Sequence, residues 1–437
     1  MKNMLVTLVS ALLIMNSCTT QEKINYPETR KTDTVDVYFG TEVADPYRWL
    51  EDDNSAETAE WVKAQNDVTN AYLAKIPFRD QIRERLTGLW NYPRYGVPFH
   101  KGNHFFFFKN DGIQNQSVLY IQDSLTGTPR VFLDPNKLSA DGTTSLGTYS
   151  VSKDGKYFAY AISKAGSDWN EIYVMETATG QQLNDKLEWV KFSGISRGDG
   201  FYYSRYDKPA GGGELSSKNE FQKVYYHKVG DPQDKDVLVY ENRAYPLRNY
   251  GGSTTDDEQF LILGESESTS GNALYVKDLR NPASGFVKIA DGFRFDYNVI
   301  SNAGERFYIL TNDGAPRYRL VQVDLKNPAK ANWMTIIPEK EEVLKSAEVA
   351  GGKIICQYMM DAVSKVFVHN MDGTLMHELD LPGLGTIAGF EGNREDNQAF
   401  YSFTSFTFPS TVYTYDIAAN KSEVLYASEI NFDASGY

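Results

Sequence analysis

Cysteine, histidine and positive charge are all scarce in this sequence of 437 residues. Its two cysteines, Cys18 and Cys356, exclude a disulfide framework and any multi-cysteine metal site. The five histidines show no HExxH or similar pairing, so neither a metal nor another cofactor is expected. Lysine and arginine total 44 against 58 aspartates and glutamates, a formal net charge of −14. A nucleic-acid partner is therefore not expected, because a phosphate-binding surface needs an excess of positive charge.

The N-terminal apolar run, Leu5–Met15, is shorter than the roughly 20 residues of a membrane-spanning helix. It fits the core of a secretory signal. The run ends at Cys18, as in a bacterial lipoprotein signal, although Met15 stands where leucine is usual. We therefore predict a signal peptide over residues 1–17, lipidation of Cys18, and export as a periplasmic or outer-membrane lipoprotein. The alternative is a disordered start with a buried structural cysteine.

Residues 18–93 are predicted to form a helical N-terminal segment. Ser55 is a plausible N-cap for a helix over Ala56–Ile76, which Pro77 would end. A second short helix is predicted over Arg79–Trp90. Their aromatic residues should pack against a core.

From about residue 94 to residue 420 the sequence favours a β-propeller. Turn markers recur 44 to 57 residues apart, at Gly102, Gly155, Gly200, Asp257, Gly304, Gly352 and Asp396. A strand follows each marker: Phe105–Lys109, Tyr157–Ile162, Phe201–Arg205, Phe260–Gly264, Arg306–Thr311, Lys353–Tyr358 and Ala399–Phe403. A second strand follows each of these: Val118–Gln122, Glu171–Met175, Lys223–His227, Ala273–Lys277, Arg319–Val323, Lys365–Val368 and Thr411–Tyr415.

Seven strand pairs at the spacing of a four-stranded blade predict an all-β fold, a seven-bladed β-propeller preceded by the short helical segment. Radial stacking buries both faces of each small sheet, so the run of four phenylalanines at residues 105–108 is expected in the core. A β-sandwich or a β-helix would have to explain the sevenfold recurrence by chance.

The residues alone show no catalytic machinery. There is no Gly-x-Ser-x-Gly elbow, and Gly251-Gly252-Ser253 lacks the second flanking glycine. No GxxxxGK[ST] phosphate loop is present, so use of ATP or GTP is not supported.

Several segments resemble the prolyl oligopeptidase family of serine peptidases. The resemblance runs from Tyr26-Pro27 to the end of the chain, and it is carried by Asp45-Pro46-Tyr47-Arg48-Trp49-Leu50-Glu51-Asp52, Gly166-Ser167-Asp168-Trp169, Trp189-Val190-Lys191-Phe192-Ser193, Thr311-Asn312-Asp313-Gly314-Ala315-Pro316 and Tyr401-Ser402-Phe403-Thr404-Ser405. It implies a helical segment packed on an α/β-hydrolase domain, and a seven-bladed propeller that covers the catalytic cavity. Short peptides are then cut on the carboxyl side of proline.

The same resemblance implies that residues 421–437 lead toward the hydrolase domain, which would be a partner in cis. The catalytic Ser, Asp and His would lie beyond residue 437, so the chain alone is expected to be catalytically silent. The helix pair should then expose an apolar patch where the hydrolase domain would pack.

The resemblance also suggests residues that line the substrate cavity. Val174 stands where the family can place an aromatic residue, and Glu265 and Ser268 stand where it can place an arginine and a cysteine. If it faced the cavity, Glu265 would favour a basic side chain upstream of the proline. The plainer alternatives are an ordinary strand residue for Val174 and a solvated loop for the other two.

Three functions remain open at this point. The first is the substrate-gating part of a prolyl oligopeptidase-like endopeptidase that acts on short proline-containing peptides. The second is a stand-alone exported propeller that binds peptides or a partner protein; it would tend to close by pairing its first and last strands. The third is a related peptidase that cleaves after basic residues.

Overall fold

The computed structural model describes residues 23–430 and 436, apart from positions 53, 197–199 and 210–216. The chain divides into two compact units, Met1–Leu86 and Thr87–Tyr437. The predicted signal peptide and Cys18 lie outside the described residues. Within the part that is described, no helix is both long enough and apolar enough to cross a membrane.

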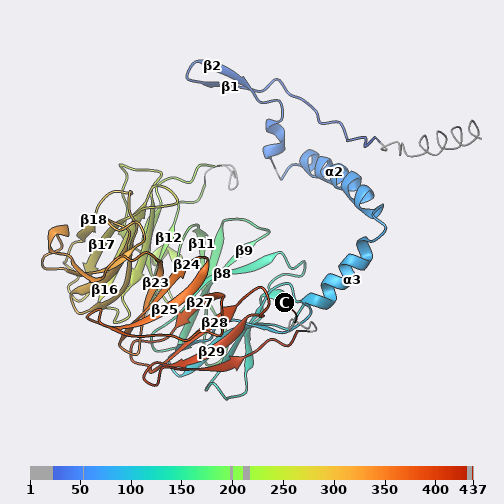
Figure 1. The fold of residues 1–437 in the computed structure, drawn as a ribbon. Coiled ribbons are helices and arrows are strands. Elements are labelled where there is room, and N and C mark those ends of the chain that lie inside the picture. The colour runs from blue at the N-terminus through green and yellow to red at the C-terminus, as the bar shows by residue number, and fades with distance from the viewer. Residues whose placement is uncertain (1–22, 53, 197–199, 210–216, 431–435, 437) are drawn as a thin grey trace, which may run out of the picture. The chain divides into compact units, whose positions relative to one another are not determined.

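The first unit contains a β-hairpin, a 3-10 turn, one complete helix and the start of a second helix (Figure 1). Its elements are β1 (Val35–Tyr38), β2 (Thr41–Ala44), η1 (Arg48–Glu51), α2 (Ala56–Ala74) and the start of α3 (Arg79–Trp90). Ser55 caps α2 as predicted, because its hydroxyl accepts a hydrogen bond from the Thr58 amide at 3.0 Å. The hairpin was not predicted; Phe39 and Gly40, with φ of 52° and 85°, form its two-residue turn.

The second unit is all-β beyond α3 and has the propeller arrangement expected from the sequence. Its described residues form six antiparallel sheets, of which five have four or five strands and one has seven. The five-stranded sheet contains β3 (Arg94–Tyr95), β4 (Phe99–Lys101), β5 (His104–Asn110), β6 (Val118–Gln122) and β7 (Arg130–Leu133). The seven-stranded sheet contains β8 (Thr144–Val151), β9 (Tyr157–Lys164), β10 (Asn170–Glu176), β11 (Gln182–Val190), β12 (Gly200–Arg205), β13 (Lys223–Lys228) and β14 (Val237–Tyr240).

Each of the remaining four sheets has four strands in sequence order. They are β15 (Asn249–Thr254), β16 (Phe260–Ser266), β17 (Ala273–Asp278) and β18 (Val287–Ala290); β19 (Tyr297–Ala303), β20 (Arg306–Thr311), β21 (Arg319–Asp324) and β22 (Met334–Ile337); β23 (Val343–Ala350), β24 (Lys353–Met360), β25 (Val363–Asn370) and β26 (Leu375–Glu378); and β27 (Thr386–Glu391), β28 (Gln398–Thr404), β29 (Thr411–Asp416) and β30 (Lys421–Tyr426). Short 3-10 turns lie at η2 (Pro135–Lys137), η4 (Gln233–Lys235) and η5 (Lys330–Asn332).

Hydrophobic side chains between adjacent sheets form the core. One cluster joins Phe260 and Val276 of the β15–β18 sheet to Phe307 and Val321 of the next. In the run of four phenylalanines, Phe106 and Phe107 are buried, as predicted. Such face-to-face packing removes apolar surface that a single small sheet would leave in water.

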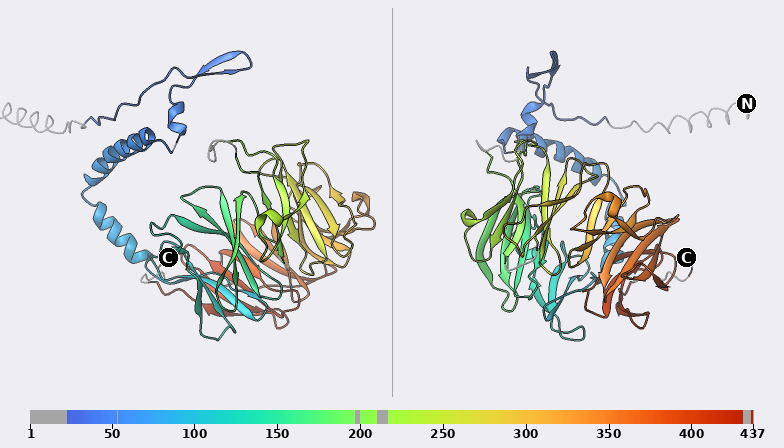
Figure 2. Two further views of the ribbon diagram at one scale, coloured as in Figure 1. Left: turned by 180° about the vertical axis from the view of Figure 1, so that it is seen from behind. Right: turned by 90° about the vertical axis from the view of Figure 1, so that its left-hand side faces the viewer.

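The first and last sheets lie side by side, which closes the ring (Figures 1 and 2). Tyr95 of β3 stacks on Tyr426 of β30 with ring centroids 4.7 Å apart. His100 of β4 contacts Asp396 at 3.0 Å, and Lys101 donates to Asn393 at 3.0 Å. These contacts are made by side chains; among the described residues, no strand of the first sheet pairs with a strand of the last.

Two predictions need correction, one on the number of separate sheets and one on where the last strand ends. The structure does not divide the repeats into seven separate sheets, because Val190 of β11 pairs with Arg205 of β12 and joins two strand groups into one seven-stranded sheet. The predicted linker from residue 421 begins inside a strand, since Lys421–Tyr426 forms β30 against β29.

Candidate functional site

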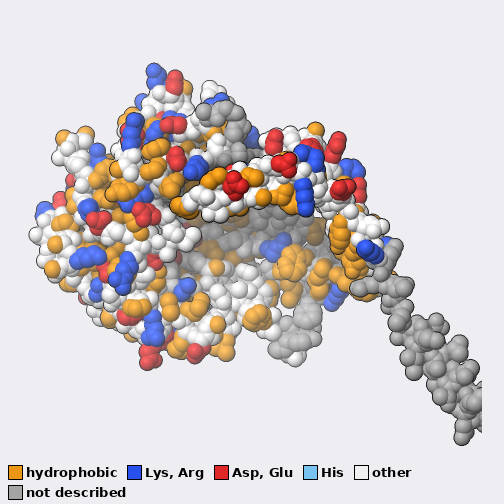
Figure 3. Space-filling model, turned by 90° about the horizontal axis from the view of Figure 1, so that it is seen from above, with side chains coloured by type: hydrophobic (Ala, Val, Ile, Leu, Met, Phe, Trp, Pro, Cys, Tyr) orange, Lys and Arg blue, Asp and Glu red, His pale blue; other side chains and the backbone are white. Residues whose placement is uncertain are grey.

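The loops at one end of the sheets form the candidate site, which we call the apolar loop face. In each four-stranded sheet, the start of the first strand, the end of the second and the start of the third lie together, as Asn249, Ser266 and Ala273 do. The loops and strand ends on this side expose large hydrophobic side chains: Ile113, Phe192, Phe221, Tyr245, Leu247, Met359, Met360, Leu384, Phe406 and Phe408. Figure 3 views the molecule from above, where hydrophobic side chains lie exposed among charged ones. Large contiguous apolar patches mark interfaces or ligand sites, and we therefore take this end of the sheets, where these residues recur from loop to loop, as the candidate site.

Phe192 is presented to solvent by an unusual backbone just after β11. Its side chain is 58% exposed, and its φ is 54°. Trp189, three residues earlier, also has a positive φ, of 64°. Left-handed backbone is unfavourable for a bulky residue, and such residues concentrate at functional sites.

Aromatic rings and a lysine surround this segment. Trp169 lies edge-on to Trp189 and to Tyr206, with centroids 5.8 and 6.0 Å apart. The Lys191 ammonium lies 5.2 Å from the Trp169 ring and 5.3 Å from the Phe192 ring. The cluster can pack against an apolar group or stack on an aromatic or prolyl ring of a ligand.

Glu265 lies at the same end of the molecule but is not available to a ligand. It is 2% exposed, and its carboxylate binds the Arg248 guanidinium at 2.8 Å and accepts a hydrogen bond from Tyr275 at 3.1 Å. Burial alone would lower the pKa of Arg248, but hydrogen bonds to Glu265 and Glu267 outweigh it and raise that pKa. Arg248 also stacks 3.4 Å from the centroid of the Tyr245 ring. The negative charge of Glu265 is thus already compensated inside the chain.

The other two predicted lining residues differ in exposure. Ser268 is exposed in the β16–β17 loop, on the apolar loop face. Val174 is fully buried in β10 and packs in a cluster with Ile172 and Leu187. This placement matches the plainer alternative for Val174, whereas contact of Ser268 with a ligand stays a prediction.

His227 has two carboxylates beside it but is poorly suited to act as a base. It is fully buried, with Asp236 2.7 Å from Nδ1 and Asp185 2.9 Å from Nε2. Burial alone would lower the pKa of His227, but the hydrogen bonds to Asp185 and Asp236 outweigh it and raise that pKa to about 9. The imidazole is therefore protonated at neutral pH and cannot accept a proton there.

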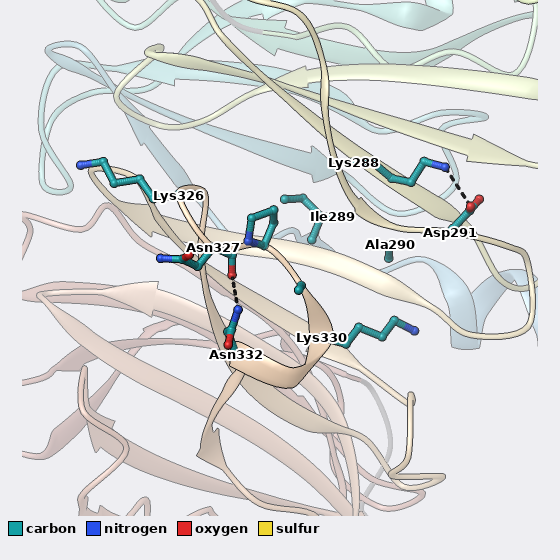
Figure 4. Close-up of a pocket in the computed structure, with 10 residues that line it drawn as sticks. Lys288, Ile289, Ala290, Asp291, Lys326, Asn327, Lys330 and Asn332 are labelled. Carbon is teal, nitrogen blue, oxygen red and sulfur yellow. Dashed lines mark hydrogen bonds and ion pairs between the residues drawn. The ribbon is translucent and has the colours of Figure 1, made fainter.

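A cleft of about 470 Å³ opens between the β15–β18 and β19–β22 sheets (Figure 4). Its lining includes Lys288, Lys326 and Lys330. Each lysine already has a carboxylate partner: Asp291, Glu305 and Asp313, respectively. The cleft therefore offers an anion no unpaired lysine.

Comparison with known proteins assigns the family. Residues 26–428 match the family model described as "Prolyl oligopeptidase, N-terminal beta-propeller domain". The chain therefore belongs to the prolyl oligopeptidase family, of which it contains the propeller portion. It is 43% identical over 416 residues to a prolyl endopeptidase of Elizabethkingia meningoseptica, and 41% identical over 423 residues to that of Elizabethkingia miricola. These alignments cover 95% and 96% of this chain but only 59% and 60% of the relatives.

Solved structures agree with this assignment. A structure from a study of two prolyl endopeptidases superposes with a TM-score of 0.86 at 31% identity, covering 94% of this chain and 61% of that one. Prolyl oligopeptidase B from Galerina marginata, bound to a 25mer macrocyclization substrate, superposes with a TM-score of 0.84 at 28% identity, covering 94% and 62%. The chain thus spans about 60% of the length of the proteins it matches.

Phe192 was not among the predicted lining residues, yet it exposes an aromatic ring at this end of the sheets, whereas Val174 is buried. Phe192 is part of the motif Trp189–Ser193, which carried the family resemblance. The signal was the motif Trp189–Ser193 at the end of β11; its positive φ angles, which turn Phe192 outward, cannot be read from the sequence.

Proposed function

We propose that this chain is the propeller and N-terminal portion of an exported endopeptidase that cleaves short peptides on the carboxyl side of proline. The family match over residues 26–428 carries the proposal. In this function the propeller admits short peptides to a hydrolase domain in cis and excludes larger ones.

The exposed surfaces of the two helices give the proposal further support. The helices would need a partner, because Thr58 is the one buried residue of α2, and α3 has none. Tyr72 and Trp90 are both more than half exposed. A hydrolase domain that covered these surfaces would remove apolar area from water.

The mass of the native polypeptide tests the proposal. An immunoblot of source cells with an antibody against the propeller should detect a species well above 49.3 kDa. That species, once purified, should hydrolyse a fluorogenic Gly-Pro amide, whereas the 437-residue chain should not. A native species at or below 49.3 kDa without this activity would instead favour a stand-alone binding propeller.

The ring closure argues against that alternative. A stand-alone propeller gains by pairing its first and last strands, since pairing satisfies their exposed backbone groups. Here side chains such as Tyr95 and Tyr426 make the contact instead. Cleavage after basic residues gains no support, because Glu265 is paired with Arg248.

We also infer that the seven-stranded sheet serves as two blades, which would give seven in all. β11 and β12 share one registered pair, whereas β12 and β13 share six. The Ser193 hydroxyl accepts from the Ser204 amide, and Ser196 bonds to the Tyr202 backbone. Residues 193–196 thus run beside β12 where an inner strand would lie. A crystal structure with β11 and β12 fully paired would overturn this count.

Export with a lipid anchor at Cys18 completes the proposal. Its support is the Leu5–Met15 run that ends before this cysteine. The wild-type protein should fractionate with membranes, and Cys18→Ser should release it to the soluble fraction. Equal membrane binding by both proteins would remove the anchor from the proposal.

A further inference from the structure

We infer that Gln222 is a positioning residue that holds Phe192 on the apolar loop face for contact with the peptide. The inference rests on the proposed function, in which the propeller admits short proline-containing peptides, and it assigns contact with them to the Phe192 region of the apolar loop face. Gln222 is fully buried, so it cannot contact the peptide itself and would act only through Phe192.

The Gln222 amide joins segments from three parts of the chain. Its NH2 group donates to the backbone carbonyls of Lys191 at 2.8 Å and Phe192 at 3.4 Å. Its carbonyl oxygen accepts from the Tyr250 amide at 2.6 Å, at the start of β15. One side chain therefore fixes the backbone on which Phe192 stands and ties it to the inner strand of the next sheet.

This arrangement would be costly without a role for Phe192. The residue combines a left-handed backbone with a ring that is mostly in water, so it gains little from burial. A buried amide that directs its donors to a strained, exposed segment and anchors its acceptor on buried β15 favours presentation of the ring over packing. Ser204 lies in the same network and donates to the Tyr250 carbonyl at 2.6 Å, but its hydroxyl makes no bond to Lys191 or Phe192. It therefore supplies a matched control.

A double-mutant cycle on the 437-residue chain tests whether Gln222 acts through Phe192. Fluorescence anisotropy would measure the affinity for a fluorescein-labelled Ala-Gly-Pro-Gly peptide. Phe192→Ala and Gln222→Met should each weaken binding about tenfold, the loss expected for one aromatic contact, and Ser204→Ala by less than about twofold. The Phe192→Ala/Gln222→Met double variant should bind no more weakly than either single variant. Losses that multiply to about a hundredfold, or unchanged binding by Gln222→Met, would overturn the inference.

Limited chymotrypsin digestion tests the same inference without a ligand. Gln222→Met should speed cleavage after Phe192 about tenfold relative to cleavage after Phe406, whereas Ser204→Ala should leave this ratio unchanged. Equal acceleration at both sites would indicate general destabilisation and reject the positioning role. Gln222→Glu, which keeps the acceptor for Tyr250 but loses the donors, provides a second variant if Gln222→Met folds poorly. If the wild-type chain binds no peptide, the proposed recognition by this face fails, and the digestion still decides whether Gln222 positions Phe192.

Discussion

Replacement of His227 by glutamine should destabilise the propeller more than the loss of any single exposed ion pair. His227 of β13 bridges Asp185 of β11 and Asp236 beside β14, and all three side chains are at most 1% exposed. Tyr203 of β12 donates to the second oxygen of Asp236 at 2.6 Å. Among the described residues, one oxygen of Asp185 has no hydrogen-bond partner, so removal of the imidazolium would leave two poorly compensated buried carboxylates.

The magnitude follows from two estimates. Removal of one partner from a buried ion pair costs about 3–5 kcal/mol. The pKa of His227, about 9 in the folded chain against about 6.5 unfolded, corresponds to about 3 kcal/mol of the free energy of unfolding. This contribution is fully present below pH 6.5 and is lost as pH rises through 9, because the folded state gives up its extra proton. The pKa of Asp185 is lowered, since hydrogen bonds from His227 and Gly230 outweigh its burial, so a second loss is expected on strong acidification.

Urea unfolding at pH 6.0, 7.5 and 9.5 measures the contribution of His227 to the free energy of unfolding at each pH. The free energy of unfolding of wild type should exceed that of His227→Gln by about 3 kcal/mol at pH 6.0, and the gap should narrow toward pH 9.5. His104→Gln is the matched control; its partner Asp123 is 85% exposed, so its effect should stay below about 0.5 kcal/mol. A wild-type-minus-variant gap that is constant over this pH range would refute a protonated His227.

Three further outcomes follow from the structure. Burial, and to a lesser extent the charge of Glu391, raises the pKa of Glu348 to about 7, so ionisation of Glu348 lowers the stability of the folded chain as pH rises through 7. In urea titrations, Glu348→Gln should therefore raise the free energy of unfolding by up to about 3 kcal/mol at pH 8.5. At pH 4.5 the same substitution should leave it unchanged. Ser55→Ala should destabilise α2 by about 1 kcal/mol, seen as faster hydrogen exchange in that helix, whereas Ser55→Asp should retain the cap. Tyr426→Ala should weaken the contact between the first and last sheets by about 1–2 kcal/mol, detected by hydrogen exchange of β3 and β30, while Tyr426→Phe should keep the stacking; equal exchange in both variants would contradict this.

The strands predicted from the sequence are the two central strands of each repeat. Phe260–Gly264 and Ala273–Lys277, for example, correspond to β16 and β17, whose faces are covered by neighbouring sheets. The first and fourth strands were missed for different reasons. β15 contains Gly251 and Gly252, and the outer strand β18 begins with residues that remain exposed, so neither shows a continuous apolar run.

The seven-stranded sheet shows where repeat spacing stops being informative. Spacing places a turn near Gly200, and β12 does begin there, but it cannot show whether the preceding strand ends its sheet. That depends on a single contact, between Val190 and Arg205. Backbone pairing across such a junction is decided by local geometry rather than by hydrophobic pattern.

The sequence could not show that the charge of a candidate site residue is compensated by a distant residue. Glu265, which stands where the family can place an arginine, was predicted to favour a basic substrate group only if it faced the cavity. Arg248 lies 17 residues away in sequence, yet it neutralises this carboxylate and stacks on Tyr245. No local pattern predicts such a pairing, because it forms only when the β14–β15 loop, which contains Arg248, meets the end of β16, which contains Glu265. Glu267, the second carboxylate partner of Arg248, keeps about half of its side chain in water and is therefore the better candidate to select for charge on this face. A reversal of charge at Glu267 should alter peptide preference more than a reversal at Glu265, and it should leave the fold intact.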